Sequence, residues 1–189
     1  EVVWVSQRFA DNVIDASSYF FAENEEMAKA ERRVGKGVMG LADLMIYLKL
    51  PYGSDEMLEK TDEIFEFIAT ESYLASCALA EEKGSFPKFD REEYLKSGYV
   101  RNLPEHVRRE ISRKGIRNVC SLTVAPTGSI GTMVGVSTGI EPYYAFKYYR
   151  SGRLGKSVEI NTPIAQRYFA EHPDEKHLPN YYVSAQDLS

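Results

Sequence analysis

The pattern of hydrophobic and polar positions predicts that the first two thirds of the chain are mostly helical. An acidic, alanine-containing stretch near residues 23–29 suits an exposed helix. Apolar residues recur every three or four positions between residues 41 and 48, and again along residues 54–84. The second of these predicted helices is the clearest, because a serine can cap its start and a glycine its end. A basic, polar segment over residues 104–117 predicts one further helix.

The pattern changes to a period of two at Val119-Cys-Ser-Leu-Thr-Val-Ala125, which predicts a β-strand. Pro126 ends this strand, because proline cannot donate to a sheet ladder. The aromatic run of residues 141–150 predicts another strand, with Gly152 and Gly155 as turn signals. Helices together with these strands predict an α/β fold class.

The turn after the first predicted strand has the chemistry of an anion site. It consists of Ala125, Pro126, Thr127, Gly128, Ser129 and Ile130. Thr127 and Ser129 bring hydroxyl groups, and free backbone amides before a helix can point at a negatively charged ligand. No Gly-Lys-Ser/Thr follows, so a Walker-type nucleotide hydrolase is a poor match. The turn predicts a phosphate site of neutral donors, which holds a substrate in place rather than transferring its phosphoryl group.

Gly35-Lys-Gly-Val-Met-Gly40 has the spacing of a dinucleotide-binding fingerprint. Such a fingerprint must follow a hydrophobic strand, yet residues 27–33 are charged and favour a helix. We therefore interpret these glycines as a tight turn into a closely packed helix, with Asp43 exposed or bonded locally.

The remaining candidates for chemistry are better explained by structure. His172 and His177 lie in a polar stretch without a third ligand nearby, which predicts surface residues and no metal site. Cys77 and Cys120 show neither metal-ligand spacing nor a disulfide framework. We expect both to serve as small apolar residues rather than as redox thiols.

Composition and charge narrow the classes of protein further. The 189 residues are 43% hydrophobic and 27% charged, which is ordinary for a globular domain. A net charge of −5 argues against binding to a nucleic-acid backbone. The apolar stretches are shorter than the ~18 residues of a membrane-spanning helix, and the first residues lack the basic region and cleavage pattern that would predict a signal peptide. Sparse cysteine fits the reducing cytoplasm.

Five segments carry a resemblance to a known family. They are Asp11–Asp15, Arg32–Asp43, Ala75–Asp90, Arg117–Gly131 and the Gly-Ile-Glu-Pro sequence of Gly139–Pro142. In this order they resemble the large, catalytic subunit of ribonucleotide reductase. The Pro-Thr-Gly-Ser-Ile sequence and the last eight residues resemble the adenosylcobalamin-dependent class most.

The resemblance implies a fold and a domain. Residues 1–189 would be a helix-rich partial segment of the C-terminal half of a ten-stranded α/β barrel. Residues 1–117 would be helical, and residues 118–189 would form the strand, the phosphate-binding turn and a mixed α/β part. The chain would then be a fragment of a larger enzyme or one piece of a split gene.

The resemblance also implies a function. The complete enzyme would reduce ribonucleoside diphosphates or triphosphates to deoxyribonucleotides for DNA replication, by thiyl-radical chemistry and with adenosylcobalamin as cofactor. This segment would supply residues 125–130 as the substrate phosphate-binding loop and no catalytic residue, because it lacks an Asn-Leu-Cys-x-Glu sequence. It would be inactive alone, and its expected partners are the ribonucleotide substrate, the remainder of the reductase chain and a second copy of the complete enzyme.

Two alternatives stay open from the residues themselves. The chain could be a stand-alone nucleotide- or phosphate-binding module, which predicts binding by the isolated chain. It could also be a noncatalytic piece that docks on a reductase subunit, in which case the glycine turn would be dispensable.

Overall fold

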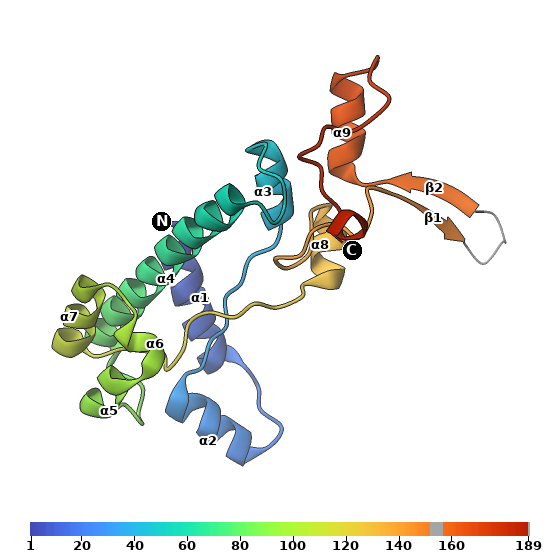
Figure 1. Ribbon diagram of the computed structural model, residues 1–189. Helices are drawn as coiled ribbons and strands as arrows, with labels where there is room; N and C mark the ends of the chain where they lie inside the picture. Colours follow the sequence, from blue (N-terminus) through green and yellow to red (C-terminus); the bar gives the residue numbers. More distant parts are fainter. Residues whose placement is uncertain (152–156, 189) are drawn as a thin grey trace. The chain divides into compact units, whose positions relative to one another are not determined.

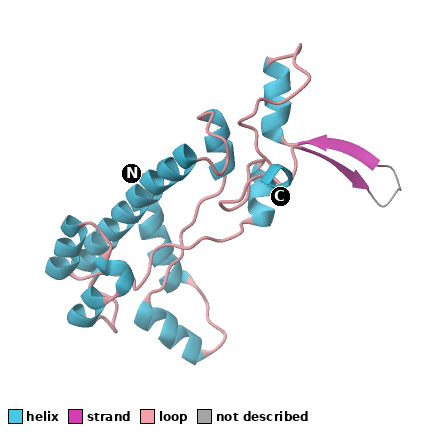
Figure 2. Ribbon diagram, in the orientation of Figure 1, coloured by secondary structure: helices cyan, strands magenta, loops and turns pink. Residues whose placement is uncertain are grey.

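Helices dominate the computed structural model, which describes residues 1–151 and 157–188 (Figures 1 and 2). The chain divides into two compact units. Unit 1 comprises Glu1–Lys36 and Asp62–Thr123, and unit 2 comprises Gly37–Thr61 and Val124–Ser189.

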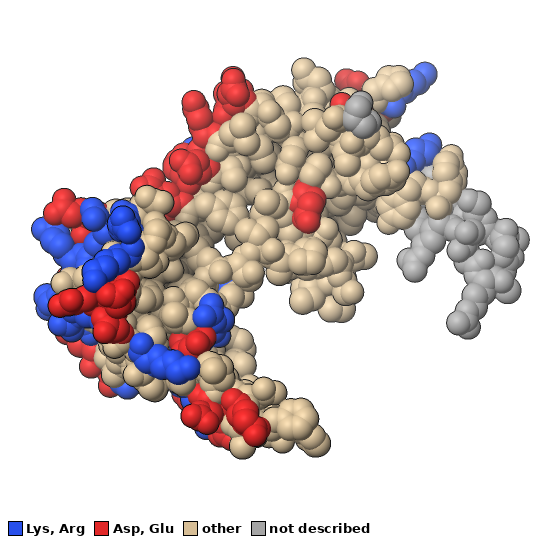
Figure 3. Space-filling model, turned by 60° about the horizontal axis from the view of Figure 1, so that its bottom comes forward, with Lys and Arg blue, Asp and Glu red and all other residues tan. Residues whose placement is uncertain are grey.

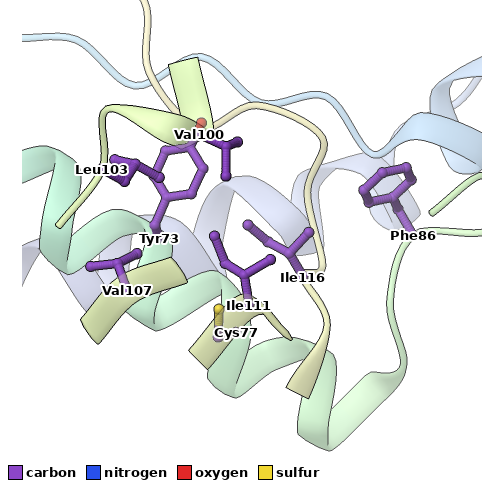
Figure 4. Packing of buried hydrophobic residues seen from close by; sticks show 8 residues of the cluster. All are labelled: Tyr73, Cys77, Phe86, Val100, Leu103, Val107, Ile111 and Ile116. Carbon is purple, nitrogen blue, oxygen red and sulfur yellow. The ribbon is translucent and has the colours of Figure 1, made fainter. Parts of the chain in front are cut away.

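Unit 1 contains α1 (Val2–Ala16), α2 (Ala22–Glu31), most of α4 (Asp55–Lys83), α5 (Arg91–Lys96), α6 (Gly98–Arg101) and α7 (Glu105–Lys114). Its core is built where the apolar faces of α4 and α7 meet, as Figure 4 shows. Tyr73 and Cys77 lie one turn apart on α4, and Val107 and Ile111 lie one turn apart on α7. Both residues of α7 are fully buried, while the rest of that helix is mainly charged, so its pattern is that of an amphipathic surface helix.

The helices predicted from periodicity are confirmed, and α4 has the predicted ends. The Ser54 hydroxyl accepts a hydrogen bond from the Met57 N–H at 3.2 Å, as an N-cap does. At the other end Gly84 adopts a φ of 86°, a left-handed conformation that favours glycine after a helix.

The strand predicted at residues 119–125 is wrong for the most part. Among the described residues this segment makes only an isolated parallel bridge, between Lys36 and Leu122. The Lys36 N–H donates to the Ser121 carbonyl at 3.0 Å, and the Thr123 N–H donates to the Lys36 carbonyl at 2.8 Å. A strand needs a continuous backbone partner, and residues 34–36 supply one for only a few positions.

Unit 2 contains α3 (Leu41–Tyr47), the first turns of α4, α8 (Gly128–Val134), β1 (Lys147–Ser151), β2 (Ser157–Asn161), α9 (Pro163–Glu171) and the short 3₁₀ helix η1 (Ala185–Leu188). β1 and β2 pair antiparallel, with Lys147 opposite Asn161 and Ser151 opposite Ser157. The strand predicted in the aromatic run is therefore confirmed for its second part. The turn signals Gly152 and Gly155 lie outside the described residues.

The sheet of the described residues has two strands, so these residues close no barrel. The helix-rich, partial character expected of the segment is confirmed, while the ten-stranded barrel stays a prediction.

Charged side chains of both signs are interspersed on the face shown in Figure 3. Several of them pair along or between helices, as Lys114 does with Glu81 at 3.0 Å and with Glu110 at 3.2 Å. Within residues 1–151 and 157–188, no helix has both the length and the apolar character needed to cross a membrane.

Candidate functional site

The predicted phosphate-binding turn lies in unit 2 and leads directly into α8. Thr127 is the N-cap residue and has a φ of 45°, a left-handed conformation that strains a β-branched side chain. After it, Gly128, Ser129 and Ile130 are exposed. The turn thus places the first residues of α8 at the surface with a defined backbone geometry.

The amides at the start of α8 are available to a ligand. The Gly131 N–H donates to the Thr127 carbonyl at 2.8 Å. Within the described part of the chain, the N–H groups of Gly128, Ser129 and Ile130 make no hydrogen bond. A Cβ added at Gly128 would meet no atom within 4 Å, so ligand oxygens can approach the backbone closely.

The Thr127 hydroxyl accepts a hydrogen bond from the Gly139 N–H at 2.8 Å. It does not cap α8 through its side chain, in contrast to the role that a threonine at this position predicts. Because a hydroxyl can accept and donate at once, its proton remains free for an anionic ligand.

Residues 137–139 form the wall behind the turn. A Cβ on Gly131 would lie 2.8 Å from the Thr138 side chain, and one on Gly139 would lie 3.1 Å from the Ala125 carbonyl oxygen. The same position on Gly139 is also closed by the carboxylate of Glu141. These close approaches explain why glycine stands at positions 131 and 139.

Asp43 holds residue 137 of this wall in place. The prediction that Asp43 is exposed or bonded to a neighbour in sequence is wrong. The side chain is buried, with 8% of the residue exposed. Its carboxylate accepts hydrogen bonds from the Ser137 N–H at 2.6 Å and from the Tyr143 hydroxyl at 2.9 Å. Burial, followed by the charge and the hydrogen bond of Asp43, raises the pKa of Tyr143 well above its ordinary value.

The glycine-rich segment before Asp43 opens a helix, as predicted. Gly40 is the N-cap residue of α3 and has a φ of 80°. Residues 27–31 of the preceding charged stretch belong to α2, and residues 32–35 form no strand, so the strand that a dinucleotide fingerprint requires is missing there.

A cavity of about 540 Å³ lies in unit 2 beside α8 and residues 137–139, and Thr132, Thr138 and Tyr143 are part of its lining. The lining includes three tyrosines, three threonines and two prolines, together with Asn161 and Gln166. None of residues 125–130 contributes to it.

Unit 1 holds a buried ionic network that the sequence analysis missed. Asp11 is 0% exposed and Arg32 is 3% exposed. The Arg32 guanidinium donates to Asp11 Oδ1 at 2.8 Å and to both carboxylate oxygens of Asp15 at 2.8 Å. Burial alone would lower the pKa of Arg32, but hydrogen bonds to Asp15 and Asp11 outweigh it and raise this pKa. The bond from Arg32 is also the main cause that lowers the pKa of Asp15.

Asn118 extends this network to the long helix. Its side-chain amide donates to Asp11 Oδ1 at 2.9 Å and to the Arg32 carbonyl at 3.0 Å. Its carbonyl oxygen accepts from Gln7 Nε2 and from the Ser76 hydroxyl, both at 2.9 Å. Four of the segments quoted above thus meet in one place, and the network is a structural connection rather than a reactive centre.

One signal could have revealed the network. Gln7, Asp11 and Ile14 are the buried residues of α1 and share one helical face. Polar residues on the buried face of a helix need internal partners, so their spacing points to a hydrogen-bonded cluster.

His172, His177 and Cys77 take the places expected from the sequence, whereas Cys120 is half-buried and lies in no strand among the described residues. His172 and His177 are exposed. Cys77 is 1% exposed, and burial raises the pKa of its thiol to about 12. The described residues contain no group of three or more metal-ligating side chains placed to hold a metal ion.

Comparisons with known proteins point to one family. The sequence model described as "Ribonucleotide reductase, barrel domain" matches residues 1–187. A vitamin B12-dependent ribonucleoside-diphosphate reductase of Thermoplasma acidophilum is 38% identical over 162 residues, which cover 85% of this chain and 19% of that protein. The protein of the same name from Mycobacterium tuberculosis is 39% identical over 161 residues, covering 85% of this chain and 21% of its own length.

A relative with a different name, the ribonucleoside-diphosphate reductase subunit alpha of Chlamydia pneumoniae, is 32% identical over 190 residues. The aligned part covers 88% of this chain and 18% of that protein, so the chain spans about a fifth of the length of these relatives. Because the family's sequence model extends over nearly every residue, this chain belongs to the ribonucleotide reductase family and forms part of its barrel domain.

Proposed function

We propose that this chain supplies the substrate phosphate-binding loop of a ribonucleoside-diphosphate reductase. The loop consists of Ala125, Pro126, Thr127, Gly128, Ser129 and Ile130. The observation that carries the proposal is the exposed start of α8, where the amides of Gly128, Ser129 and Ile130 lack partners in the described chain. Family membership makes a phosphorylated ribonucleotide the fitting ligand.

Neutral donors suit the task of holding a diphosphate. Hydrogen bonds from N–H and O–H groups to phosphate oxygens are strengthened by the ligand's charge. Thr127 and Ser129 would donate their hydroxyl protons, and the three amides would add main-chain bonds. The loop thereby positions the ribose for thiyl-radical chemistry on residues that other parts of the reductase supply.

The names of relatives support a diphosphate substrate and a cobalamin cofactor. When bound to the complete enzyme, adenosylcobalamin would supply the radical that starts the reaction. The three histidines of the described residues are exposed and gather no group of metal ligands. We assign no part of the cofactor's binding site to this chain.

The complete enzyme would provide deoxyribonucleotides for DNA replication in the cytoplasm, as a homodimer. This chain would contribute to substrate binding, and the catalytic cysteine, asparagine and glutamate would come from outside it.

The proposal is tested with Thr127→Ala and Ser129→Ala in the complete reductase. Each variant removes one hydrogen bond to a charged group, which is worth about 1.5–3 kcal/mol. We expect KM for ribonucleoside diphosphates to rise by about 10-fold to 100-fold in each variant. Steady-state kinetics with the four diphosphates and the four triphosphates measures this change and identifies the preferred class.

The matched control is Ser112→Ala, which removes an exposed serine hydroxyl from α7 in unit 1. It should leave KM unchanged. If Thr127→Ala and Ser129→Ala also leave KM unchanged, the loop does not bind the substrate and the proposal is wrong.

A further inference from the structure

Ser137 is held at both of its backbone groups by the start of α3. Its N–H donates to Asp43 Oδ2 at 2.6 Å, and its carbonyl accepts from the Gly40 N–H at 2.8 Å. The second carboxylate oxygen of Asp43 accepts from the Tyr143 hydroxyl at 2.9 Å. Both oxygens of this buried carboxylate thus have donors, and the position of Ser137 relative to α3 is fixed.

Two further residues, Thr138 and Gly139, connect Ser137 to the phosphate-binding turn. Thr138 packs against Gly131 so closely that a Cβ there would lie 2.8 Å from its methyl group. The next residue, Gly139, donates its N–H to the Thr127 hydroxyl at 2.8 Å. Residues 137–139 therefore connect the carboxylate of Asp43 to the hydroxyl that faces the proposed ligand.

Thr127 needs such support because of its backbone. A left-handed conformation costs a β-branched residue on the order of 1–3 kcal/mol and persists only where the surroundings impose it. Two hydrogen bonds hold Thr127 in this conformation. The Gly139 N–H donates to its hydroxyl, and the Gly131 N–H donates to its carbonyl at 2.8 Å. Movement of Ser137 would loosen the first of these restraints.

We propose that Asp43 is a positioning residue for the phosphate-binding loop: through Ser137, Gly139 and Thr127 it sets the affinity for the diphosphate group without touching the substrate. This inference rests on the proposed function of the loop. Asp43 lies in α3, just after the glycine-rich segment, and is buried in unit 2. The inference gives this buried residue a role in substrate binding.

The test is Asp43→Asn in the complete reductase. Asparagine keeps the size of the side chain but replaces the charged acceptor of the Ser137 N–H by a neutral one, which weakens that hydrogen bond. We expect KM for ribonucleoside diphosphates to rise about tenfold, whereas kcat falls by less than about threefold. The inhibition constant of inorganic pyrophosphate, measured as a competitor, should rise by the same factor as KM.

A double variant tests whether Asp43 acts through Thr127. If Asp43 acts through Thr127, then Asp43→Asn added to Thr127→Ala should change KM by less than about twofold, because the restrained hydroxyl is already gone. Effects that multiply in full would overturn the inference.

A second variant tests the inference even if Asp43→Asn fails to fold. Tyr143→Phe keeps the aromatic ring and removes one donor to Asp43, and it should raise KM and the pyrophosphate inhibition constant by about threefold. The matched control is Asp174→Asn, an exposed acid of unit 2, which should change neither.

The outcomes separate the inference from the proposed function. If Thr127→Ala and Ser129→Ala raise KM but Asp43→Asn and Tyr143→Phe do not, Asp43 has no positioning role and the loop still binds the substrate. If Asp43→Asn lowers kcat and the melting temperature while KM and pyrophosphate inhibition stay unchanged, its role is structural and the inference is wrong. If none of the loop variants changes KM, the proposed function itself fails.

Discussion

Lys36 shows how burial without a counter-ion changes the pKa of a single side chain. Its ammonium group donates to the Ser72 hydroxyl at 2.9 Å and to the Val3 carbonyl at 3.3 Å. No ion pair of Lys36 is found among the described residues. Burial lowers its pKa from 10.5 to about 8. Arg32, which is buried more deeply but faces two aspartates, has a raised pKa instead.

The sign of this shift leads to a prediction about stability and pH. Between pH 8 and pH 10.5 the unfolded protein binds more protons at Lys36 than the folded protein, so this residue makes stability rise with pH there. Replacing it by Lys36→Met removes the dependence. We expect the melting temperature of Lys36→Met, relative to the unchanged protein, to be higher at pH 7 than at pH 10.

Thermal unfolding across this pH range measures the difference. The control is Lys176→Met, an exposed lysine whose replacement should shift the melting temperature equally at both pH values. An equal shift for Lys36→Met would show that its ammonium is as well solvated in the folded protein as in the unfolded one.

Helix ends show how elements are set by local backbone chemistry. Gly115 ends α7 with a φ of 80° and a ψ of −168°, a combination that side chains with a Cβ rarely adopt. A Cβ there would also collide with the Ser85 hydroxyl. Gly98, which begins α6, has no atom within 4 Å of the corresponding position and no positive φ.

These two glycines form a matched pair for mutation. Gly115→Ala should destabilise the protein by at least about 1–3 kcal/mol, because strain and the contact with Ser85 add. Gly98→Ala should be neutral or stabilise the protein by up to about 1 kcal/mol, because alanine reduces the freedom of the unfolded chain. Chemical denaturation of both variants checks the prediction, and equal effects would contradict it.

At the scale of the whole molecule, the buried network ties together parts of unit 1 that are distant in sequence. Asn118 is 107 positions from Asp11 and 86 from Arg32 along the chain. Arg117 Nε and Lys83 Nζ lie 3.3 Å and 3.8 Å from the second oxygen of Asp11. A buried carboxylate surrounded by cations and amides stabilises the folded state only while every partner is present.

Neutralising Asp11 should therefore weaken one unit selectively. We expect Asp11→Asn to destabilise unit 1 by about 3 kcal/mol or more, because Arg32 then stays buried with incomplete compensation. Hydrogen exchange should become faster in α1 and α7, while amides of α9 in unit 2 keep their protection.

The comparison for this experiment is Glu82→Gln, which breaks the exposed pair between Arg8 and Glu82 and should leave exchange unchanged. Equal acceleration in both units after Asp11→Asn would mean that the two units unfold together.

The sequence by itself determined the features that depend on neighbours along the chain. Periodicity located α3 and α4, and cap residues located the ends of α4, because burial of one helical face recurs every three or four residues. The same local chemistry predicted a turn at residues 125–130; in the structure residues 125–127 are irregular, and α8 already begins at Gly128.

Only the tertiary structure decided which distant groups meet. Alternating residues at 119–125 indicated a strand, but a strand forms only where another segment pairs with it, and residues 34–36 pair with it briefly. Asp43 looked local in the sequence, yet its partners are 94 and 100 positions away. The physical reason is that backbone propensity acts over a few residues, whereas hydrogen bonds of buried carboxylates are satisfied by whichever donors folding brings within about 3 Å.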